Sequence, residues 1–201
     1  LCNPNNPTGE LVRRADALTL LHDISSKGGM LFLDEAFIDL SNPDESLGDV
    51  VEPALFVARS LTKSFAIPGL RFGYGFGDED LVERMETLRL PWTVNAVAEA
   101  YALQAFKVYG ELARSRRLIA EEREYLTRGL SEMALRCSPS EANYLLVNLP
   151  VRASMLQERL LAKGILVRDC TSFGLPDAIR VAVRTHEENS RLLEAIRECL
   201  S

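Results

Sequence analysis

The chain has 201 residues, is 47% hydrophobic and carries a formal net charge of -6 at pH 7. This composition is sufficient for a buried core in one domain or in a two-lobed unit. The acidic balance and the lack of a dense Lys/Arg run argue against nucleic-acid and membrane partners and favour small molecules. No apolar run approaches the roughly 18 residues of a membrane-spanning helix, so we expect a cytoplasmic protein. The four cysteines form no C-x-x-C pair, so we expect neither a disulfide framework nor a metal site.

Helix and strand patterns alternate in the N-terminal half. The first residues, "LCNPNNPTGEL", lack a methionine and read as a loop that normally follows a strand, so we expect an N-terminally truncated chain. Apolar residues from Ala17 to Ile24 have helical spacing, and Gly28-Gly29 predict its end. Short apolar runs at 30–37 and 54–61 predict strands that helices bury on both faces.

The C-terminal half begins with a strongly helical region. From Val94 to about Arg136 the pattern predicts two long helices, with weak breaks at the glycines. Beyond them we expect a smaller α/β lobe, and we place the boundary between the lobes near residue 108. Its predicted elements are a strand in "NYLLVNL", a helix at 155–163, strands in "ILVR" and "IRVAVR", and a closing helix through 192–196.

One lysine lies in "RSLTKSFAIPGLRFGYG" (59–75), directly after a predicted strand. A lone lysine is usually a solvated surface group. Lys63, however, follows its strand at the edge where α/β proteins bind ligands. A lysine that loses hydration there favours its neutral amine, which can attack a carbonyl. The aldehyde of pyridoxal phosphate is the carbonyl that we expect.

Neighbouring residues meet the other needs of this cofactor. The hydroxyls of Ser60 and Thr62 and the guanidinium of Arg71 suit its phosphate. Asp34 ends the strand in "LFLDEAF", where a carboxylate would keep the pyridine nitrogen protonated. Asn6 in "NNPTG" could donate from its amide to the 3′ oxygen. Each residue alone has an ordinary structural explanation, but their order together predicts a cofactor site.

These motifs resemble those of the class I/II aminotransferase superfamily, whose members are pyridoxal-phosphate enzymes of fold type I. "NNPTG", "LDEAF", "SLTKSFAIPGLRFGYG" and "IRVAVR" occur in the order of that family, and the resemblance covers essentially the whole chain. It implies the C-terminal part of an α/β enzyme. We expect the C-terminal half of a large, mostly parallel cofactor-binding domain at 1–108 and a small α/β domain at 109–201. The resemblance also implies a homodimer with active sites at its interface.

The resemblance also implies a role for each matching position. Lys63 would bond the cofactor aldehyde, Asp34 would pair with the pyridine nitrogen, and Asn6 would be a ligand of the 3′ oxygen. Arg180 would bind the α-carboxylate of the substrate. Three residues would hold the cofactor phosphate: Ser60, Thr62 and Arg71.

Within the superfamily the segments resemble histidinol-phosphate aminotransferases and the threonine-phosphate decarboxylases of cobalamin biosynthesis. Phe37 stands where aminotransferases usually carry tyrosine, and Trp92-Thr93 stands where the histidinol-phosphate enzymes tend to show Phe or Tyr followed by Asn. The segments "ANYLL", "ILVRDC" and "RVAVRTHEEN" resemble the decarboxylase branch. We therefore expect decarboxylation of L-threonine O-3-phosphate to aminopropanol phosphate, with a histidinol-phosphate-type transamination that uses 2-oxoglutarate as the alternative.

Four further features extend the substrate site or have simpler interpretations. A phosphorylated substrate needs another guanidinium, so we expect Arg168 in "ILVR" to bind its phosphate. For Arg184 a surface ion pair is the favoured interpretation. Thr185-x-x-Glu188 predicts a helix capping box rather than a metal site. "GYGFG" lacks the spacing of a dinucleotide-binding turn.

A different class of protein is an inactive truncated fragment that folds or pairs without turnover. In the family the N-terminal part supplies a strand and helix of the cofactor cup, a phosphate loop and an aromatic ring stacked on the cofactor. A chain that lacked these would expose apolar sheet surface and hold the cofactor poorly.

Overall fold

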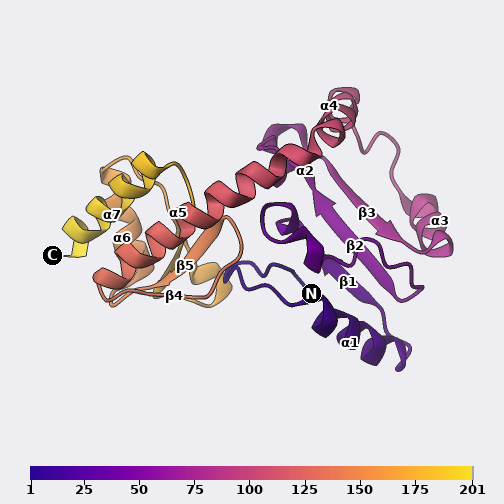
Figure 1. Ribbon diagram of the computed structural model, residues 1–201, viewed down its shortest axis with the longest axis horizontal. Helices are drawn as coiled ribbons and strands as arrows, with labels where there is room; N and C mark the ends of the chain where they lie inside the picture. Colours follow the sequence, from indigo (N-terminus) through magenta and orange to yellow (C-terminus); the bar gives the residue numbers. More distant parts are fainter. Residues whose placement is uncertain (201) are drawn as a thin grey trace. The chain divides into compact units, whose positions relative to one another are not determined.

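The computed structural model describes residues 1–200 and divides into two compact units (Figure 1). The first unit consists of Leu1–Pro4 and Leu11–Arg114. The second consists of Asn5–Glu10 and the residues from Ser115 onward. The expected family domains at 1–108 and 109–201 stay a prediction, because contacts between residues define compactness and do not identify a family domain.

A three-stranded sheet forms the centre of the first unit. Its strands are β1 (Leu31–Asp34), β2 (Leu55–Ser60) and β3 (Gly73–Gly77), in the order β1-β2-β3. β1 and β2 are parallel, with Asp34 opposite Ala58, whereas β2 and β3 are antiparallel, with Ser60 opposite Gly73. The chain start lies along β1, because Cys2 forms a parallel bridge to Asp34.

Helix α1 (Arg14–Ser25) covers one face of this sheet and confirms the predicted first helix. Ala17 and Leu21 of α1 are buried with Leu33 of β1 and Val57 of β2. Gly29 donates to the carbonyl of Ile24 at 2.9 Å and closes the helix, as the glycine pair predicts.

Burial on both faces of the strands, which the apolar runs predict, is wrong. β1 alternates between buried and exposed positions, and Phe32 is 53% exposed. Phe32 stacks on Phe56 with ring centroids 5.6 Å apart. Successive side chains of a strand point to opposite faces, so only every second residue of β1 and β2 faces α1. Phe32 of β1 is therefore an apolar side chain on a face that the described chain leaves accessible.

The other elements of the first unit surround the ends of the strands. Helix α2 (Leu61–Ser64) is a single turn that follows β2. Helix α4 (Ala96–Lys107) packs Ala102 and Ala105 in one cluster with Leu61 of that turn. Helices α4 and α5 (Leu112–Glu132) confirm the pair of long helices that the sequence predicts between residues 94 and 136. The bounds are α2 (Leu61–Ser64), α3 (Glu79–Leu88), α4 (Ala96–Lys107) and the 3₁₀ turns Ile38–Leu40, Pro43–Glu45, Pro68–Leu70 and Tyr109–Glu111.

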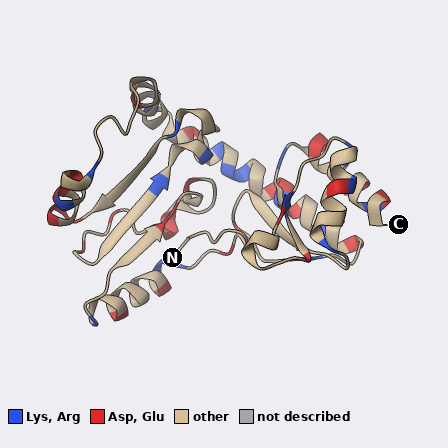
Figure 2. Cartoon of the chain, turned by 180° about the vertical axis from the view of Figure 1, so that it is seen from behind, with Lys and Arg blue, Asp and Glu red and all other residues tan. Residues whose placement is uncertain are grey.

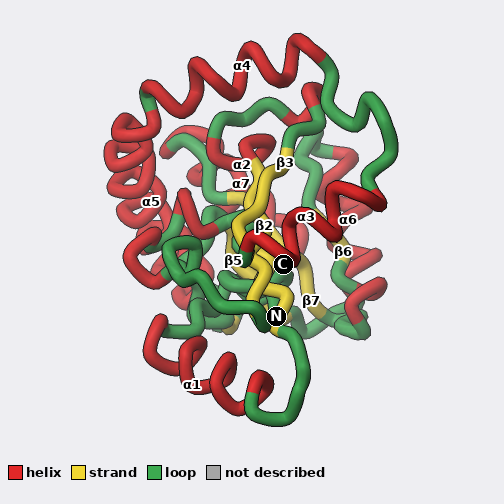
Figure 3. Tube along the Cα trace, turned by 90° about the vertical axis from the view of Figure 1, so that its right-hand side faces the viewer, coloured by secondary structure: helices red, strands yellow, loops and turns green. Residues whose placement is uncertain are grey.

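The second unit is an antiparallel sheet covered by helices, whose strands are yellow and helices red in Figure 3. The strand order is β4 (Arg136–Cys137), β5 (Tyr144–Asn148), β7 (Ala178–Ala182) and β6 (Arg168–Asp169). Leucine and isoleucine side chains of the helices and strands form its core, including Leu126, Leu145, Leu160 and Ile196. The elements are α5 (Leu112–Glu132), β4 (Arg136–Cys137), β5 (Tyr144–Asn148), α6 (Ala153–Ala162), β6 (Arg168–Asp169), a 3₁₀ turn (Thr171–Phe173), β7 (Ala178–Ala182) and α7 (His186–Leu200).

The predicted strand "ILVR" is wrong for residues 165–167, because β6 begins only at Arg168. The backbone N–H of Ile165 instead donates to the carbonyl of Leu160 at the end of α6. The side-chain amide of Gln157 donates to the carbonyl of Val167 at 2.9 Å. Those backbone groups complete a helix end rather than a sheet. Among residues 1–200, no helix is both long and apolar enough to cross a membrane.

Candidate active site

Asp34 and Ser60 lie on one face of the first sheet, where β1 and β2 end. Asp34 is opposite Ala58, and cross-strand partners share a face. Ser60 is two residues beyond Ala58, so its side chain points to the same face. Oδ1 of Asp34 accepts from the backbone N–H of Ala36 at 2.9 Å, which fixes this carboxylate at the strand end. The carboxyl-end position expected for the site is therefore present in this unit.

Lys63 lies on α2, one turn beyond Ser60. Its Nζ is 5.4 Å from the ring centroid of Phe37, which follows Asp34 by three residues. The expected loss of hydration at Lys63 is wrong for the described residues, because α2 buries Leu61 and Thr62 and leaves Lys63 exposed. The structure thus brings the lysine beside the segment that carries Asp34, but on the accessible side of its turn.

The three residues predicted for the cofactor phosphate lie around the same strand end. Oγ of Ser60 and Oγ1 of Thr62 are hydrogen-bonded at 2.7 Å. Arg71 precedes β3 by two residues, and Gly73 of β3 is the partner of Ser60. The guanidinium of Arg71 donates to the carbonyl of Pro68 at 3.1 Å, and its backbone is left-handed with φ 54°. The hydroxyl pair is formed, whereas the arginine is engaged locally.

The opposite face of the same strand ends carries a buried charged cluster that sequence reasoning missed. Arg59 Nε donates to Glu35 at 3.1 Å and its Nη1 donates to Asp39 at 3.3 Å. Both carboxylates are buried, with Glu35 0% and Asp39 1% exposed. Burial alone lowers the pKa of Arg59, but the two carboxylates raise it above its usual value. Figure 2 colours Lys and Arg blue and Asp and Glu red, and both colours occur along the chain.

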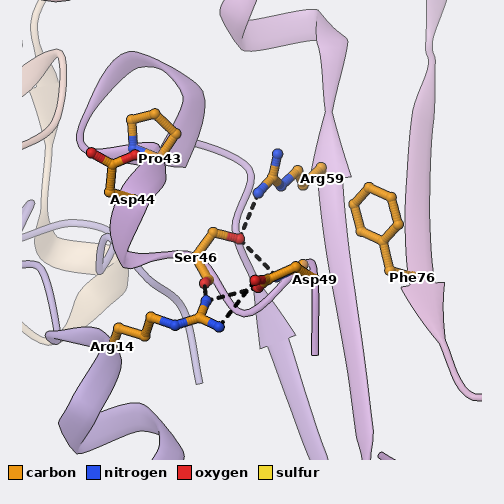
Figure 4. A pocket seen from close by; sticks show the side chains of 8 residues that line it. Arg14, Pro43, Asp44, Ser46, Asp49, Arg59 and Phe76 are labelled. Carbon is orange, nitrogen blue, oxygen red and sulfur yellow. Dashed lines mark hydrogen bonds and ion pairs between the residues drawn. The ribbon is translucent and has the colours of Figure 1, made fainter. Parts of the chain in front are cut away.

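A polar cavity of about 500 Å³ adjoins this cluster, and Figure 4 shows Ser46 between Arg59 and Arg14. Nη2 of Arg59 donates to Oγ of Ser46 at 2.5 Å, and Arg14 pairs with Asp49 at 2.8 Å. The arginines lining this cavity are therefore already paired with groups of the chain. A sequence signal existed, because the alternate apolar residues of each strand lead to a charged one: Leu33 is followed two positions later by Glu35, just beyond β1, and Val57 by Arg59 within β2.

Asn6 and Arg180 meet in the second unit. Nη1 of Arg180 donates to Oδ1 of Asn6, and the guanidinium carbon lies 5.0 Å from the ring centroid of Tyr144. The loop that carries Asn6 is held by Tyr144, whose hydroxyl donates to the carbonyl of Asn5 at 2.9 Å. At the other end of the loop, the backbone N–H of Glu141 donates to the carbonyl of Gly9 at 2.9 Å.

Arg168 lies directly opposite Arg180 in the pairing of β6 with β7. It is exposed, donates to Oγ of Ser172 at 2.9 Å and lies 5.8 Å from the ring centroid of Phe173. Like charges directly opposite each other on neighbouring strands repel, which makes this pair a candidate for binding an anion.

The capping box before α7 is confirmed. The backbone N–H of Glu188 donates to Oγ1 of Thr185 at 3.4 Å, and the N–H of Thr185 donates back to Glu188 at 3.3 Å. Arg184 pairs with Glu188 at 2.6 Å, which confirms the predicted surface ion pair. Bonds from Arg184 and Thr185 lower the pKa of Glu188 to about 2.

The donor set of the first unit fits three groups of pyridoxal phosphate. An amine, a carboxylate and a pair of hydroxyls gather at the end of β1 and β2. The amide oxygen of Asn6 accepts from Arg180, so its amide N–H₂ is the part suited to donate to a ring oxygen.

Comparison with known proteins assigns the chain to a family. Residues 1–196 match the model of the family described as aminotransferase class I and II. The chain is 36% identical over 202 residues to the histidinol-phosphate aminotransferase of Symbiobacterium thermophilum, covering 100% of this chain and 56% of that protein. It is 37% identical over 205 residues to a protein of Caldanaerobacter subterraneus subsp. tengcongensis provisionally named threonine-phosphate decarboxylase, covering 98% and 56%.

Two solved structures have the same fold. The histidinol-phosphate aminotransferase from Clostridium acetobutylicum superposes with a TM-score of 0.91 at 29% identity, over 98% of this chain and 62% of that one. The L-threonine-O-3-phosphate decarboxylase from Porphyromonas gingivalis gives 0.84 at 26% identity, over 100% and 63%. The chain thus spans about 56% of the curated relatives it matches. The fold is that of part of a fold type I enzyme dependent on pyridoxal phosphate, and the chain belongs to the class I and II aminotransferase family.

Proposed function

We propose that these residues form part of the active site of an enzyme that decarboxylates L-threonine O-3-phosphate to aminopropanol phosphate, a reaction of cobalamin biosynthesis. The observation that carries the cofactor assignment is the placement of Asp34 and Ser60 on one sheet face, with Lys63 one turn later. Similarity to proteins named threonine-phosphate decarboxylase supports the choice of substrate.

Each proposed site residue would hold one part of the cofactor. When bound, pyridoxal phosphate withdraws electrons from the bond on the substrate α-carbon that stands perpendicular to its ring. Lys63 would hold its aldehyde carbon, and Asp34 would keep the proton on its pyridine nitrogen. Asn6 would donate to its 3′ oxygen. Its phosphate would be held by Ser60, Thr62 and Arg71.

Arg180 and Arg168 would hold the two anionic groups of the substrate. Arg180 would bind the α-carboxylate, and its bond to Asn6 would keep that guanidinium beside a cofactor ligand. Arg168, directly opposite on β6, would bind the phosphate. A ligand with two anionic ends would offset the repulsion between these arginines, which is why a phosphorylated amino acid suits the pair.

Phe37 supports decarboxylation over transamination. Its ring lies beside Lys63 and carries no hydroxyl to donate toward the cofactor. In the decarboxylation, Lys63 or a water would protonate the substrate α-carbon after carbon dioxide leaves. Arg180 would have to orient the carboxylate so that the bond to it, and not the bond to hydrogen, is the one that breaks.

Histidinol-phosphate-type transamination with 2-oxoglutarate is the second candidate. It is supported by the similarity to enzymes of that name at 36% identity and at a TM-score of 0.91. Lys63 would then remove the α-hydrogen of the substrate as a proton and deliver it to the former aldehyde carbon of the cofactor. The same side chains serve both reactions, so the orientation of the substrate decides between them.

The test uses the longest natural chain that contains these residues, with pyridoxal phosphate and L-threonine O-3-phosphate. We expect carbon dioxide without a 2-oxo acid, and we expect Lys63→Ala to abolish it. Lys27→Ala, an exposed lysine after α1, is the matched control and keeps the activity. A 2-oxo acid without carbon dioxide establishes the aminotransferase instead. An absence of both products, with no visible band from bound cofactor, contradicts both candidate reactions.

A homodimer is the assembly that we propose for the active protein. Light scattering of the loaded protein then gives twice the mass of one chain. A monomer with full activity contradicts this part of the proposal.

A further inference from the structure

Asp39 is a buried carboxylate that the proposed chemistry does not use. It lies in the 3₁₀ turn Ile38–Leu40, five residues after Asp34, and is 1% exposed. A buried charge is costly unless it is paired and hydrogen-bonded, so the bonds that Asp39 makes indicate what it holds in place.

The two oxygens of Asp39 bind different parts of the first unit. Oδ1 accepts from Nη1 of Arg59 at 3.3 Å and from the hydroxyl of Tyr109. Oδ2 accepts from Oγ of Ser64 at 3.0 Å. Ser64 is the residue after Lys63 and the last residue of α2. One carboxylate oxygen therefore faces β2 and Tyr109, and the other faces the turn that carries the lysine.

Helix α2 depends on such outside bonds for its orientation. It has four residues, and Ala66, two residues beyond its end, has a left-handed φ of 53°. A single helical turn is unstable alone, because nucleation fixes several residues for one hydrogen bond. Within the turn, Ser64 also donates to the carbonyl of Ser60 at 3.3 Å. The shorter bond to Asp39 fastens the turn to a different segment of the chain.

We propose that Asp39 is a positioning residue for Lys63, acting through the hydroxyl of Ser64. Asp39 belongs to the segment that leaves β1 with Asp34 and Phe37, and Ser64 belongs to the segment that leaves β2. The bond between them sets how the lysine lies relative to Asp34. A cofactor held by both residues requires a fixed position of Lys63 relative to Asp34, because small misplacements of catalytic groups lower the rate by large factors. This inference rests on the proposed function of Lys63.

The competing explanation is that Asp39 only stabilises the fold through Arg59. Two variants separate the roles. Ser64→Ala removes the bond to Oδ2 and leaves the ion pair of Asp39 with Arg59 in place. Tyr109→Phe removes a hydrogen bond to Oδ1 of the same carboxylate and leaves the Ser64 bond in place, so it is the matched control.

The experiment measures how cofactor binds to Lys63 in the longest natural chain that contains these residues. Three readouts are taken for each variant: the Kd for pyridoxal phosphate, the visible circular dichroism of the lysine-bound cofactor, and the yield at Lys63 after borohydride trapping, by mass spectrometry. We expect Ser64→Ala to raise the Kd about tenfold, to change the circular dichroism and to lower the trapping yield, since a hydrogen bond to a charged group is lost. Ser64→Ala and Tyr109→Phe are expected to lower the Tm by similar amounts, because each loses one hydrogen bond to Asp39, but Tyr109→Phe leaves all three readouts as in the wild type.

The outcomes distinguish this inference from the function beneath it. If the wild type traps cofactor at Lys63 and Ser64→Ala behaves like Tyr109→Phe, the positioning role is overturned and the proposed function stands. If the wild type traps none at Lys63, both fail together. Ser64→Thr, which restores a hydroxyl, is expected to recover the trapping yield, and a failure to recover it counts against the role.

Discussion

Arg180 on β7 donates a hydrogen bond to the side chain of Asn6, a residue 174 positions earlier in the sequence. The bond joins the residue proposed for the substrate carboxylate to one proposed for the cofactor ring. It exists because the loop 5–10 packs against residues 140–144 and not against its own sequence neighbours. The position of Asn6 therefore depends on how closely this loop can approach residues 140–144.

Gly9 sets that approach. Its φ is 79°, and a Cβ there would lie 2.0 Å from Oγ of Ser140. We expect Gly9→Ala to cost about 1–3 kcal/mol of unfolding free energy, through overpacking and an unfavourable backbone conformation. Gly110→Ala, where nothing lies within 4 Å of the added atom, is the control. Urea denaturation checks both, and equal midpoints would show that the loop does not need the glycine.

Arg59 neutralises two buried carboxylates, and its side chain is only 12% exposed. We expect Arg59→Met to destabilise the protein by about 3–5 kcal/mol, because Glu35 and Asp39 are left buried without their cation. Arg13→Met removes an ion pair to Glu45 from a side chain that is 54% exposed, and about 0–1 kcal/mol is expected. Denaturation curves of the two variants provide the measurement. Similar losses would mean that the cluster is no more important than a surface pair.

Arg168 is predicted to recognise the substrate phosphate. We expect Arg168→Ala to raise the KM for L-threonine O-3-phosphate roughly tenfold or more, since a charge-assisted hydrogen bond is lost. Its removal also relieves repulsion with Arg180, so the Tm without ligand is expected to stay equal or rise slightly. Arg136→Ala, at an exposed position of β4, is the control. An unchanged KM refutes the assignment of Arg168.

Glu188 contributes to stability in a defined pH window. Its pKa is lowered from 4.5 to about 2 by bonds from Arg184 and Thr185, so the carboxylate is better stabilised in the folded chain. Such a contribution is complete above the unfolded pKa and is lost as pH falls through 4.5 toward 2. We expect Glu188→Gln to lower the Tm at pH 7 and to match the wild type near pH 2.

The matched control is Glu187→Gln, a charge change in the same first turn of α7 that leaves the bonds of Glu188 in place. The Tm difference between each variant and the wild type is followed from pH 7 to pH 2. If both variants lose the same amount over this range, the effect comes from the general field of the helix terminus.

Local signals determined much of the secondary structure. The periodic apolar residues of α1, its closing glycines and the Thr185–Glu188 capping box act within a few residues, and each appears where the pattern predicts it. β3 was missed, because its sequence "GYGFG" has too many glycines to favour a strand by itself. Gly75 is suited to this position because an added Cβ would lie 2.4 Å from the ring of Phe56. The neighbouring strand imposed that structure.

The candidate residues of the site could be chosen from the sequence, because each belongs to a short motif with a known chemical use. The surroundings of these residues in the folded chain could not be predicted from the sequence. The exposure of Lys63 depends on what packs around α2, and the pairing of Arg168 with Arg180 and the bond from Ser64 to Asp39 each join two different elements of the fold. Sequence patterns report local conformation and the face of an element, whereas burial and long-range hydrogen bonds depend on which elements pack together. Only the tertiary structure decides those contacts.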